Sequence, residues 1–208
     1  MNLEPALQHL RKHDAVIADL IDRYPRPDIV KHTNYYQELV ESIISQQLSV
    51  KAAAAIRRRF VDLFAADFPS PEDILSQDIE TLRSVGLSRQ KATYIQDLAA
   101  KVLDDSVRFG HLDSLSNDEI VAELTHIKGV GEWTVHMFLL FCMGRLDVLP
   151  TGDLGIKNGI AALYDHVAPV TPDTIREIAQ RNQWHPYESV ASLYVWQSLD
   201  NTPKASVG

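Results

Sequence analysis

The sequence predicts an all-α protein, and three observations support this. Apolar residues recur with helical spacing along most of the chain. Alternation of β-branched and polar residues, the pattern of a half-buried strand, is absent over any useful length. Pro, Gly, Asn, Asp and Ser separate the apolar segments into short connections. A chain of 208 residues with 45% hydrophobic residues can bury a sizeable core, either as one domain or as two small lobes.

Each predicted helix is bounded by turn residues or by a residue that can cap a helix. In the stretch 116–129, for example, Ile120 and Leu124 are spaced for one helix face, and Ser116 or Asn117 can cap its start. The predicted helices span residues 4–23, 34–48, 50–65, 71–84, 88–105, 117–125, 132–143, 153–164, 172–183 and 186–199. The chain is therefore expected to be a succession of short helices.

Composition excludes several classes of protein. No apolar run approaches the roughly 18 residues of a membrane span, and the polar start "MNLEPALQHLRKHD" does not resemble a signal peptide. The single cysteine, Cys142, lies in the apolar run "FLLFCMG" and is expected to be an inert core thiol. One cysteine cannot form an internal disulfide or supply four ligands to an iron–sulfur cluster. A cytoplasmic compartment is the default expectation.

The net charge of −8 argues against a protein that coats nucleic acid nonspecifically. It leaves room for a local basic patch, because phosphate contacts need only a few groups in one place. Candidates are "IRRRF" (56–60), "SRQKA" (88–92) and Lys128. A solvated helix face explains adjacent arginines equally well.

The segment "IKGVGEWTVHMFLLF" (127–141) predicts two helices joined by a Gly-Val-Gly turn. Gly129 and Gly131 allow backbone angles forbidden to other residues, and they allow another backbone or a ligand to come close. Such a turn exposes backbone N–H groups at a helix start, which is a typical anion or phosphate site, although an ordinary helix corner is the alternative. A dinucleotide-binding turn is excluded, because no strand precedes the glycines and Thr134 stands at the third glycine position. The weaker motif at 82–99, with one glycine, is expected to be an ordinary corner.

Two other stretches contain unusual polar residues. In "NYYQELVESIISQQLSV" an apolar stripe from Tyr36 to Ile44 ends at Gln46 and Gln47. A buried amide needs partners, so this pair indicates either a functional contact or simply the end of a helix. In "DVLPTGDLGIKNGIAALY" Asp153 is the obvious N-cap, a role worth about 1 kcal/mol without any catalysis.

Four motifs in this order resemble those of the helix–hairpin–helix DNA glycosylase superfamily: "IISQQLS", "IKGVGEWT", "LPTGDLGI" and "WHPYESVASLYVW". The first and last are similar to the DNA-3-methyladenine glycosylase II branch, and the resemblance covers nearly all of residues 30–200. It implies two helical lobes flanking an active-site cleft, in the compact form without an N-terminal β domain. One lobe, 34–144, would contain the wedge helix and the hairpin, and the other, 1–33 plus 145–208, would carry the catalytic aspartate.

The resemblance implies a monofunctional enzyme that hydrolyses the N-glycosidic bond of alkylated purines, of the 3-methyladenine and 7-methylguanine class, in base-excision repair. Asp153 would be catalytic. Trp184 would be a structural tryptophan, and Trp133 has a core position as its alternative. The implied base-pocket residues are Trp133, Trp196, Tyr187 and His136.

The resemblance also implies DNA contacts in the first lobe. Gln47, with Gln46 and Leu48 beside it, would be the wedge that fills the gap left by an extruded nucleotide. The implied phosphate contacts are Lys128, Gly129, Val130, Gly131 and Thr134. The backbone carbonyls of Thr125, Ile127 and Val130 would hold Na⁺ or K⁺, and no other cofactor is expected.

Three positions qualify the implied activity. Relatives that also cleave the DNA strand place a Schiff-base lysine where Trp133 stands, so lyase activity is not expected. Glu132 and Glu188 replace residues that are commonly neutral or basic in the family, which puts the substrate range in doubt. His9 and His13 share a helix face, but no third ligand is evident, so a zinc site is not predicted.

The expected partner is double-stranded DNA containing alkylated bases, bound by a monomer without a membrane partner. The expected location is the cytoplasm, at the nucleoid, in a bacterium or the nucleus in a eukaryote. One alternative is a noncatalytic helix–hairpin–helix protein that binds damaged or structured DNA. A helix-turn-helix regulator is poorly supported, because no helix clusters Arg, Asn and Gln for base edges.

Overall fold

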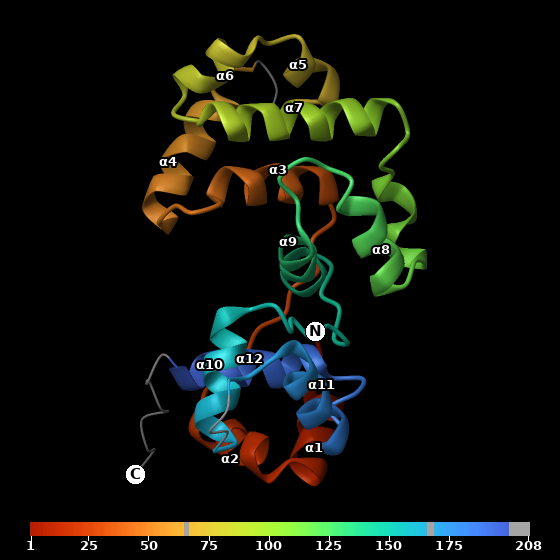
Figure 1. The fold of residues 1–208 in the computed structure, drawn as a ribbon. Coiled ribbons are helices and arrows are strands. Elements are labelled where there is room, and N and C mark those ends of the chain that lie inside the picture. Colours follow the sequence, from red (N-terminus) through yellow and green to blue (C-terminus); the bar gives the residue numbers. More distant parts are fainter. Residues whose placement is uncertain (65–66, 166–168, 200–208) are drawn as a thin grey trace. The chain divides into compact units, whose positions relative to one another are not determined.

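The computed structural model describes residues 1–64, 67–165 and 169–199, and every regular element within these ranges is helical (Figure 1). The predicted all-α class is therefore confirmed. In the same ranges, no helix is both long enough and apolar enough to cross a membrane.

The chain divides into two compact units. The central unit is His32–Phe138, and the terminal unit combines Met1–Lys31 with Leu139–Gly208. The boundaries of the lobes expected from the sequence lie after residues 33 and 144, whereas the boundaries of the compact units lie after Lys31 and Phe138.

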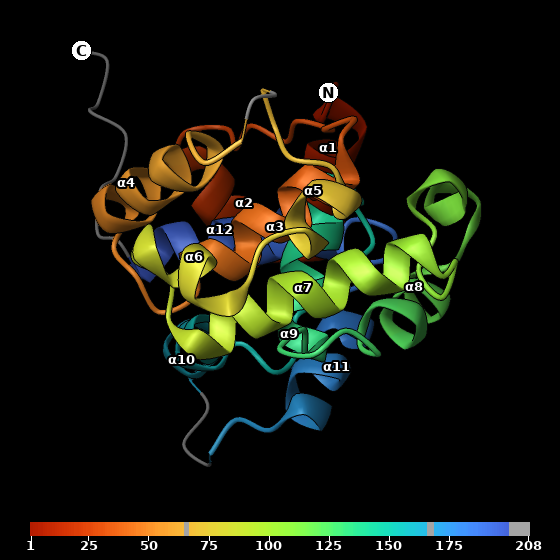
Figure 2. The ribbon, with the colours of Figure 1, turned by 90° about the horizontal axis from the view of Figure 1, so that it is seen from above.

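The central unit is built around its longest helix, α7 (Arg89–Leu103). This helix buries Ala92, Ile95, Leu98 and Ala99 and lies between α3 on one side and the pair α5 and α6 on the other (Figures 1 and 2). The other elements of this unit are α3 (Tyr35–Ser45), α4 (Val50–Val61), α5 (Pro71–Leu75), α6 (Ile79–Ser84), the 3₁₀ helix η1 (Phe109–Ser114), α8 (Asn117–Leu124) and α9 (Glu132–Met137). Helix α4 packs against α3, and α8 packs against α9.

The terminal unit is built around α12 (Glu188–Leu199), which packs against α1, α2 and α10. Its other elements are α1 (Glu4–His13), α2 (Ala15–Arg23), α10 (Leu154–Leu163) and α11 (Pro172–Arg181). A π-helical turn, η2 (Phe138–Cys142), leads from the central unit into this one. Helices α10 and α12 approach closely at Gly159, where a Cβ atom would lie 2.3 Å from Cγ1 of Val195. This approach places the start of α10 beside the side chains of α12.

The helix starts follow local sequence signals. Ser116 caps α8, and its side chain accepts the backbone N–H of Glu119 in a complete capping box. Ser70 caps α5 in the same way. The two candidates for the start of α8 are thus resolved in favour of Ser116.

Two predicted helices are interrupted, each at an aspartate. The predicted helix 4–23 breaks at Asp14, whose side chain accepts the backbone N–H groups of Val16 and Ile17 and begins α2. The predicted helix 71–84 breaks before Asp78, which caps α6. A side chain that caps the next helix competes with helix continuation, which explains both corrections. The 3₁₀ helix η1 was not predicted from the sequence.

Candidate active site and nucleic-acid interface

The hairpin between α8 and α9 is tightly bonded to its own unit. The backbone N–H of Val130 donates to the carbonyl of Ile127 at 3.1 Å, closing the turn. The backbone N–H of Lys128 donates to Oδ2 of Asp97, on α7, at 2.9 Å. The hairpin is therefore held in place before any ligand binds.

The two hairpin glycines differ in what they need. Gly129 has φ of +79°, and a Cβ atom there would lie 2.0 Å from Cδ2 of Tyr94. Gly131 has φ of −97° and ψ of 172°, which any residue adopts, and a Cβ atom there would meet nothing within 4 Å. The backbone freedom predicted for both glycines is therefore confirmed at Gly129 and wrong at Gly131. Within the protein, Gly131 only leaves open space beside the backbone.

The predicted phosphate-binding residues differ in what they present. The ammonium of Lys128 lies 3.3 Å from Oδ1 of Asp97, and two-thirds of its side chain is exposed. The side chains of Val130 and Thr134 are buried. An anion at the hairpin would therefore meet the Lys128 ammonium and backbone groups, with the charge of Asp97 close by.

The carbonyls predicted to hold a monovalent cation lie at the end of α8 and in the hairpin. Thr125 is the C-cap of α8, and the Ile127 carbonyl already accepts the N–H of Val130. Main-chain carbonyl oxygens are hard ligands that suit hard cations, so the donor set fits Na⁺ or K⁺ in kind.

The predicted wedge lies in an exposed turn between α3 and α4. The stripe on α3 is buried at Val40, Ile43 and Ile44, whereas Gln47 is exposed. Gln47 has φ of +57°, the left-handed conformation that costs a non-glycine residue about 1 kcal/mol. Such conformations persist where surrounding contacts enforce them, and they are common at functional sites.

Gln46, the other half of the glutamine pair, connects this turn to the hairpin. Its Nε2 donates to the carbonyl of Gly129 at 2.9 Å. The amide that seemed out of place at the end of an apolar stripe thus has a partner 83 residues away. Leu48 leaves 38% of its surface exposed in the same turn.

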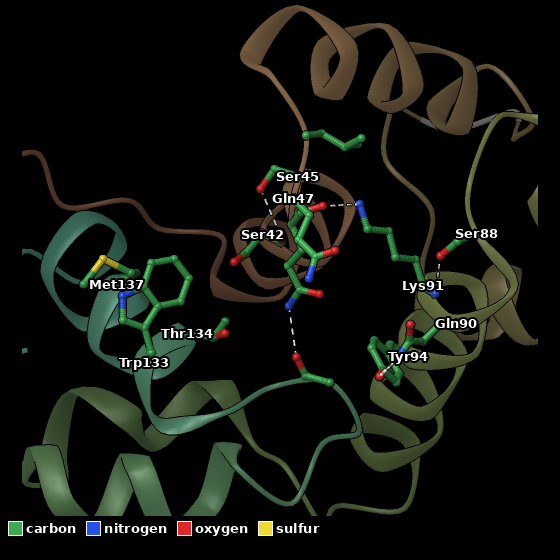
Figure 3. A pocket seen from close by; sticks show the side chains of 13 residues that line it. Ser42, Ser45, Gln47, Ser88, Gln90, Lys91, Tyr94, Trp133, Thr134 and Met137 are labelled. Atoms are coloured by element: carbon green, nitrogen blue, oxygen red, sulfur yellow. Dashed lines mark hydrogen bonds between the residues drawn. The ribbon is translucent and has the colours of Figure 1, made fainter. Parts of the chain in front are cut away.

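A pocket of about 720 Å³ lies between this turn, α7 and the hairpin (Figure 3). One side presents the polar groups of Gln47, Gln90 and Lys91, and Trp133 and Met137 line it from α9. Trp133 is 50% exposed, so the alternative of a core tryptophan is wrong. The pocket joins amide groups to an aromatic face, a combination that suits a nucleobase.

His136 follows on the next turn of α9 and is largely buried. Burial lowers the pKa of its imidazole, although Glu132, whose Oε1 lies 3.8 Å away, opposes this shift. Burial thus favours the neutral form of the imidazole. A neutral ring does not repel a cationic base.

Asp153 is the N-cap of α10 in the terminal unit, as predicted. Its Oδ1 accepts the backbone N–H of Ile156 at 2.9 Å and the indole Nε1–H of Trp196 at 2.8 Å. The carboxylate, which is only partly buried, is thereby oriented by its own helix and by α12. The capping bond and the bond from Trp196 are therefore accepted by the same carboxylate oxygen, Oδ1.

Gly155 makes this contact possible, and it was not among the site residues predicted from the sequence. A Cβ atom at position 155 would lie 2.9 Å from Cδ1 and Nε1 of Trp196 and 3.0 Å from Oδ1 of Asp153. Its neighbour Gly152 has nothing within 4 Å of an added Cβ atom. The second glycine of "TGDLG" was the available signal.

Exposed apolar side chains surround the Asp153–Trp196 pair. The ring of Trp196 stacks on Phe141, with centroids 6.0 Å apart and an interplanar angle of 24°. Phe141 is 50% exposed and Leu154 is 70% exposed. Phe141 could not be distinguished from a core residue in the sequence, because it lies inside the run "FLLF". An aromatic and aliphatic surface beside a carboxylate suits a flat cationic ligand.

The other predicted site residues of this unit have different surroundings. Trp184 is fully buried and donates to Oδ2 of Asp14 at 2.7 Å, which confirms it as a structural residue. The ring of Tyr187 packs edge-on against His9, with centroids 5.2 Å apart. Glu188 forms a 3.0 Å pair with His185.

The sequence matches a family model over residues 40–183, that of the HhH-GPD superfamily base excision DNA repair proteins. The chain belongs to this superfamily. It is 33% identical over 184 residues to DNA-3-methyladenine glycosylase 1 of Schizosaccharomyces pombe, which covers 88% of this chain and 80% of the relative.

Two solved structures of similar proteins match nearly the whole chain. A DNA-3-methyladenine glycosidase from Bacillus halodurans superposes with a TM-score of 0.86 at 32% identity, covering 97% of this chain and 92% of that one. The Schizosaccharomyces pombe 3-methyladenine DNA glycosylase in complex with abasic DNA gives a TM-score of 0.78 at 32% identity, covering 94% and 97%.

Proposed function

We propose that this protein is a monofunctional DNA glycosylase that hydrolyses the N-glycosidic bond of alkylated purines in double-stranded DNA. The observation that carries the proposal is the Asp153 carboxylate, partly exposed at the start of α10 and oriented by the indole N–H of Trp196 at 2.8 Å. Membership of a superfamily of base excision DNA repair proteins supports it, as do relatives named for 3-methyladenine.

The chemistry requires only one carboxylate. Cleavage of an N-glycosidic bond passes through an oxocarbenium-like sugar, and a fixed negative charge stabilises that cation and can orient the attacking water. Alkylated purines of the 3-methyladenine and 7-methylguanine class carry positive charge before reaction and leave as neutral bases, so no strong general acid is needed. This contrasts with the paired carboxylates of most glycoside hydrolases.

The aromatic surface near Asp153 would hold the extruded base. A cationic purine gains about 0.5–2 kcal/mol from cation–π attraction to an aromatic face. Trp196, stacked on the half-exposed Phe141, offers such a face in the terminal unit. In the central unit, Trp133 and His136 would contribute to base recognition, as the resemblance implies.

The central unit would bind the DNA backbone and fill the gap that the extruded nucleotide leaves in the duplex. Backbone N–H groups near Gly131, where the structure leaves open space, would contact a phosphate. A Na⁺ or K⁺ on the carbonyls of Thr125, Ile127 and Val130 would add positive charge beside that phosphate. The exposed amide of Gln47 would enter the duplex and hydrogen-bond to the orphaned partner base.

Base release is the direct test of the proposal. Purified protein is incubated with methylated duplex DNA, and the released bases are identified by mass spectrometry. We expect free 3-methyladenine or 7-methylguanine and intact strands until the abasic sites are cleaved with alkali. Tight binding to damaged DNA without base release would favour the noncatalytic alternative instead.

A second experiment tests the reaction type. Because Trp133 occupies the position of the Schiff-base lysine, borohydride should trap no covalent protein–DNA adduct. A trapped adduct would contradict monofunctional hydrolysis and would require another amine at the reaction site.

The wedge assignment has its own test. Replacing Gln47 by alanine should weaken binding to duplex DNA with an abasic-site analogue more than binding to undamaged duplex. Equal losses on both would make Gln47 a general contact.

A further inference from the structure

Lys91 is bonded to the turn that carries Gln47. It lies in the first turn of α7 and extends toward that turn (Figure 3). Its Nζ donates to the carbonyls of Ile44 at 2.8 Å and of Gln46 at 2.5 Å. Both carbonyls belong to the end of α3, where the helix leaves carbonyl groups without helical partners and carries partial negative charge. One ammonium therefore clamps the last turn of α3 and the residue that precedes Gln47.

The lysine is partly buried, so its role differs from that of a solvated surface charge. Burial lowers the pKa of the Lys91 ammonium, which reflects the loss of water around it. The two carbonyls replace that water. Hydrogen bonds from a charged donor are about twice as strong as neutral ones, so this contact can fix a backbone conformation.

The conformation that it fixes is unfavourable on its own. Gln47 has φ of +57°, and the preceding Gln46 is bonded on both sides: its carbonyl accepts from Lys91, and its side chain donates to Gly129 at 2.9 Å. The backbone N–H of Leu48 also donates to the carbonyl of Ser45 at 3.1 Å, which closes the turn. Without the bonds to Gln46, this backbone bond alone would hold the chain at 46–48 less firmly against the more favourable right-handed or extended angles. The exposed amide of Gln47 would then lose its fixed direction.

The same helix supports the hairpin. Tyr94, about one turn beyond Lys91, packs against Gly129 so closely that a Cβ atom there would lie 2.0 Å from its ring. Gln90 donates to the Tyr94 hydroxyl. The first turns of α7 therefore contact both the turn with Gln47 and the hairpin.

We propose that Lys91 is a positioning residue for the wedge: its ammonium holds the turn at 46–48 in the conformation that presents Gln47 to the gap in the duplex. This deepens the proposed function and rests on it. It differs from the reading of "SRQKA" as a basic patch, in which Lys91 would contact a DNA phosphate directly.

The test compares Lys91→Met, which keeps the length and removes the charge, with Lys91→Arg, which keeps a donor. Lys51→Met is the matched control, because Lys51 is an exposed cation in the first turn of α4, close to the same turn in sequence. Binding to abasic-analogue and undamaged duplexes is measured over a range of salt concentrations. Base extrusion is followed with 2-aminopurine beside the lesion, and thermal unfolding checks each fold.

For Lys91→Met we expect about a tenfold loss of the preference for abasic-analogue over undamaged duplex, and slower extrusion to match. The slope of log K against log salt should stay that of the wild type. Lys91→Arg should recover part of the preference, and Lys51→Met should keep all of it.

Two results would overturn the proposal. A salt slope smaller by about 0.9, with equal losses on both duplexes, would make Lys91 a phosphate contact. If the Lys91→Met protein is less stable but keeps its preference for abasic-analogue duplex, Lys91 is only a structural residue. If that protein does not fold, Lys91→Gln takes its place in the same measurements. If only the role of Lys91 is wrong, the wild-type protein still releases bases from methylated DNA. If the proposed function is wrong, the wild-type protein releases none.

Discussion

Asp14 and Asp153 make the same local arrangement in the terminal unit and differ in their surroundings. Each caps a helix, α2 or α10, through its side chain. Each also accepts an indole N–H from a tryptophan, Trp184 at 2.7 Å and Trp196 at 2.8 Å. The cap and the indole bond alone would assign the two aspartates the same role.

The carboxylate of Asp14 is fully used inside the protein. The residue is 2% exposed, and its Oδ2 accepts the Tyr164 hydroxyl at 2.6 Å as well as the Trp184 indole. Burial raises the pKa of Tyr164, and the neighbouring Asp14 raises it further, so this hydroxyl remains a neutral donor. Asp14 therefore holds α2 to two distant segments of the core.

Asp153 has the cap and the tryptophan but only partial burial. Leu154, the next residue in the chain, is exposed, and so is Phe141, which stacks on Trp196. The comparison teaches that accessibility, and not the shared cap and indole bonds, separates a structural carboxylate from one that can act on a ligand.

Replacing Asp153 by asparagine should have the largest effect. Asparagine caps a helix about as well as aspartate, so stability should change little. The negative charge is lost, and such electrostatic stabilisation is worth about 3–4 kcal/mol, roughly a hundred- to a thousand-fold in rate. Single-turnover excision from methylated DNA measures the loss, and binding to damaged DNA should persist. Near-normal excision by the folded variant would return Asp153 to being only a cap.

Replacing Asp14 by alanine should affect stability instead. It leaves the buried indole of Trp184 and the partly buried hydroxyl of Tyr164 without their acceptor, at about 1–3 kcal/mol each. We expect a loss of about 3 kcal/mol in the free energy of unfolding, measured by denaturant titration. Excision per folded molecule should stay near normal. A specific catalytic defect without destabilisation would break the distinction between the two aspartates.

The two tryptophans offer a matched pair of substitutions. Trp196→Phe keeps an aromatic ring against Phe141 but removes the donor to Asp153, a bond to a charged group worth about 2 kcal/mol. Excision should fall by about tenfold or more, with a small change in stability. Trp184→Phe should lower stability and change excision little, as measured by denaturant titration and single-turnover excision. Similar profiles for both variants would argue against different roles.

The smallest effect is expected at Gly155. Alanine there must displace Trp196, because its Cβ atom would lie 2.9 Å from the indole ring, at a cost of about 1 kcal/mol. Its better helix propensity, also about 1 kcal/mol, offsets the change in stability, so the excision rate is the informative measurement. Gly152→Ala, with open space around it, is the control and should excise normally. Equal rates for both variants would show that the position of the indole does not matter.

Local features of the fold were predictable from the sequence. Helix periodicity gave the all-α class, and capping residues such as Ser116 gave several helix starts, because both act within a few residues of the chain. The break at Asp14 was not predicted. The apolar spacing continues through it, and its partners Tyr164 and Trp184 are 150 and 170 residues away.

The site divides in the same way. The order of four motifs pointed to Asp153, Trp196, Gln47 and the hairpin, and the structure adds how they are held. Gly129 has a positive φ and also meets the ring of Tyr94, which lies on another helix, whereas Gly131 has neither constraint. Likewise, the sequence marked Lys91 only as part of a basic run, and packing brings it to the end of α3.

The sequence by itself determined the class of fold, several of the helix starts and the residue types available for chemistry, since these depend on propensity, periodicity and capping within short segments. Only the tertiary structure decided which aspartate is buried, which tryptophan donates to each aspartate, and against which glycine a neighbouring side chain packs. Asp153 and Trp196 are 43 residues apart, and their contact exists because α10 and α12 pack closely at Gly159. Burial and long-range hydrogen bonds are properties of that packing, and no short segment of the chain specifies them.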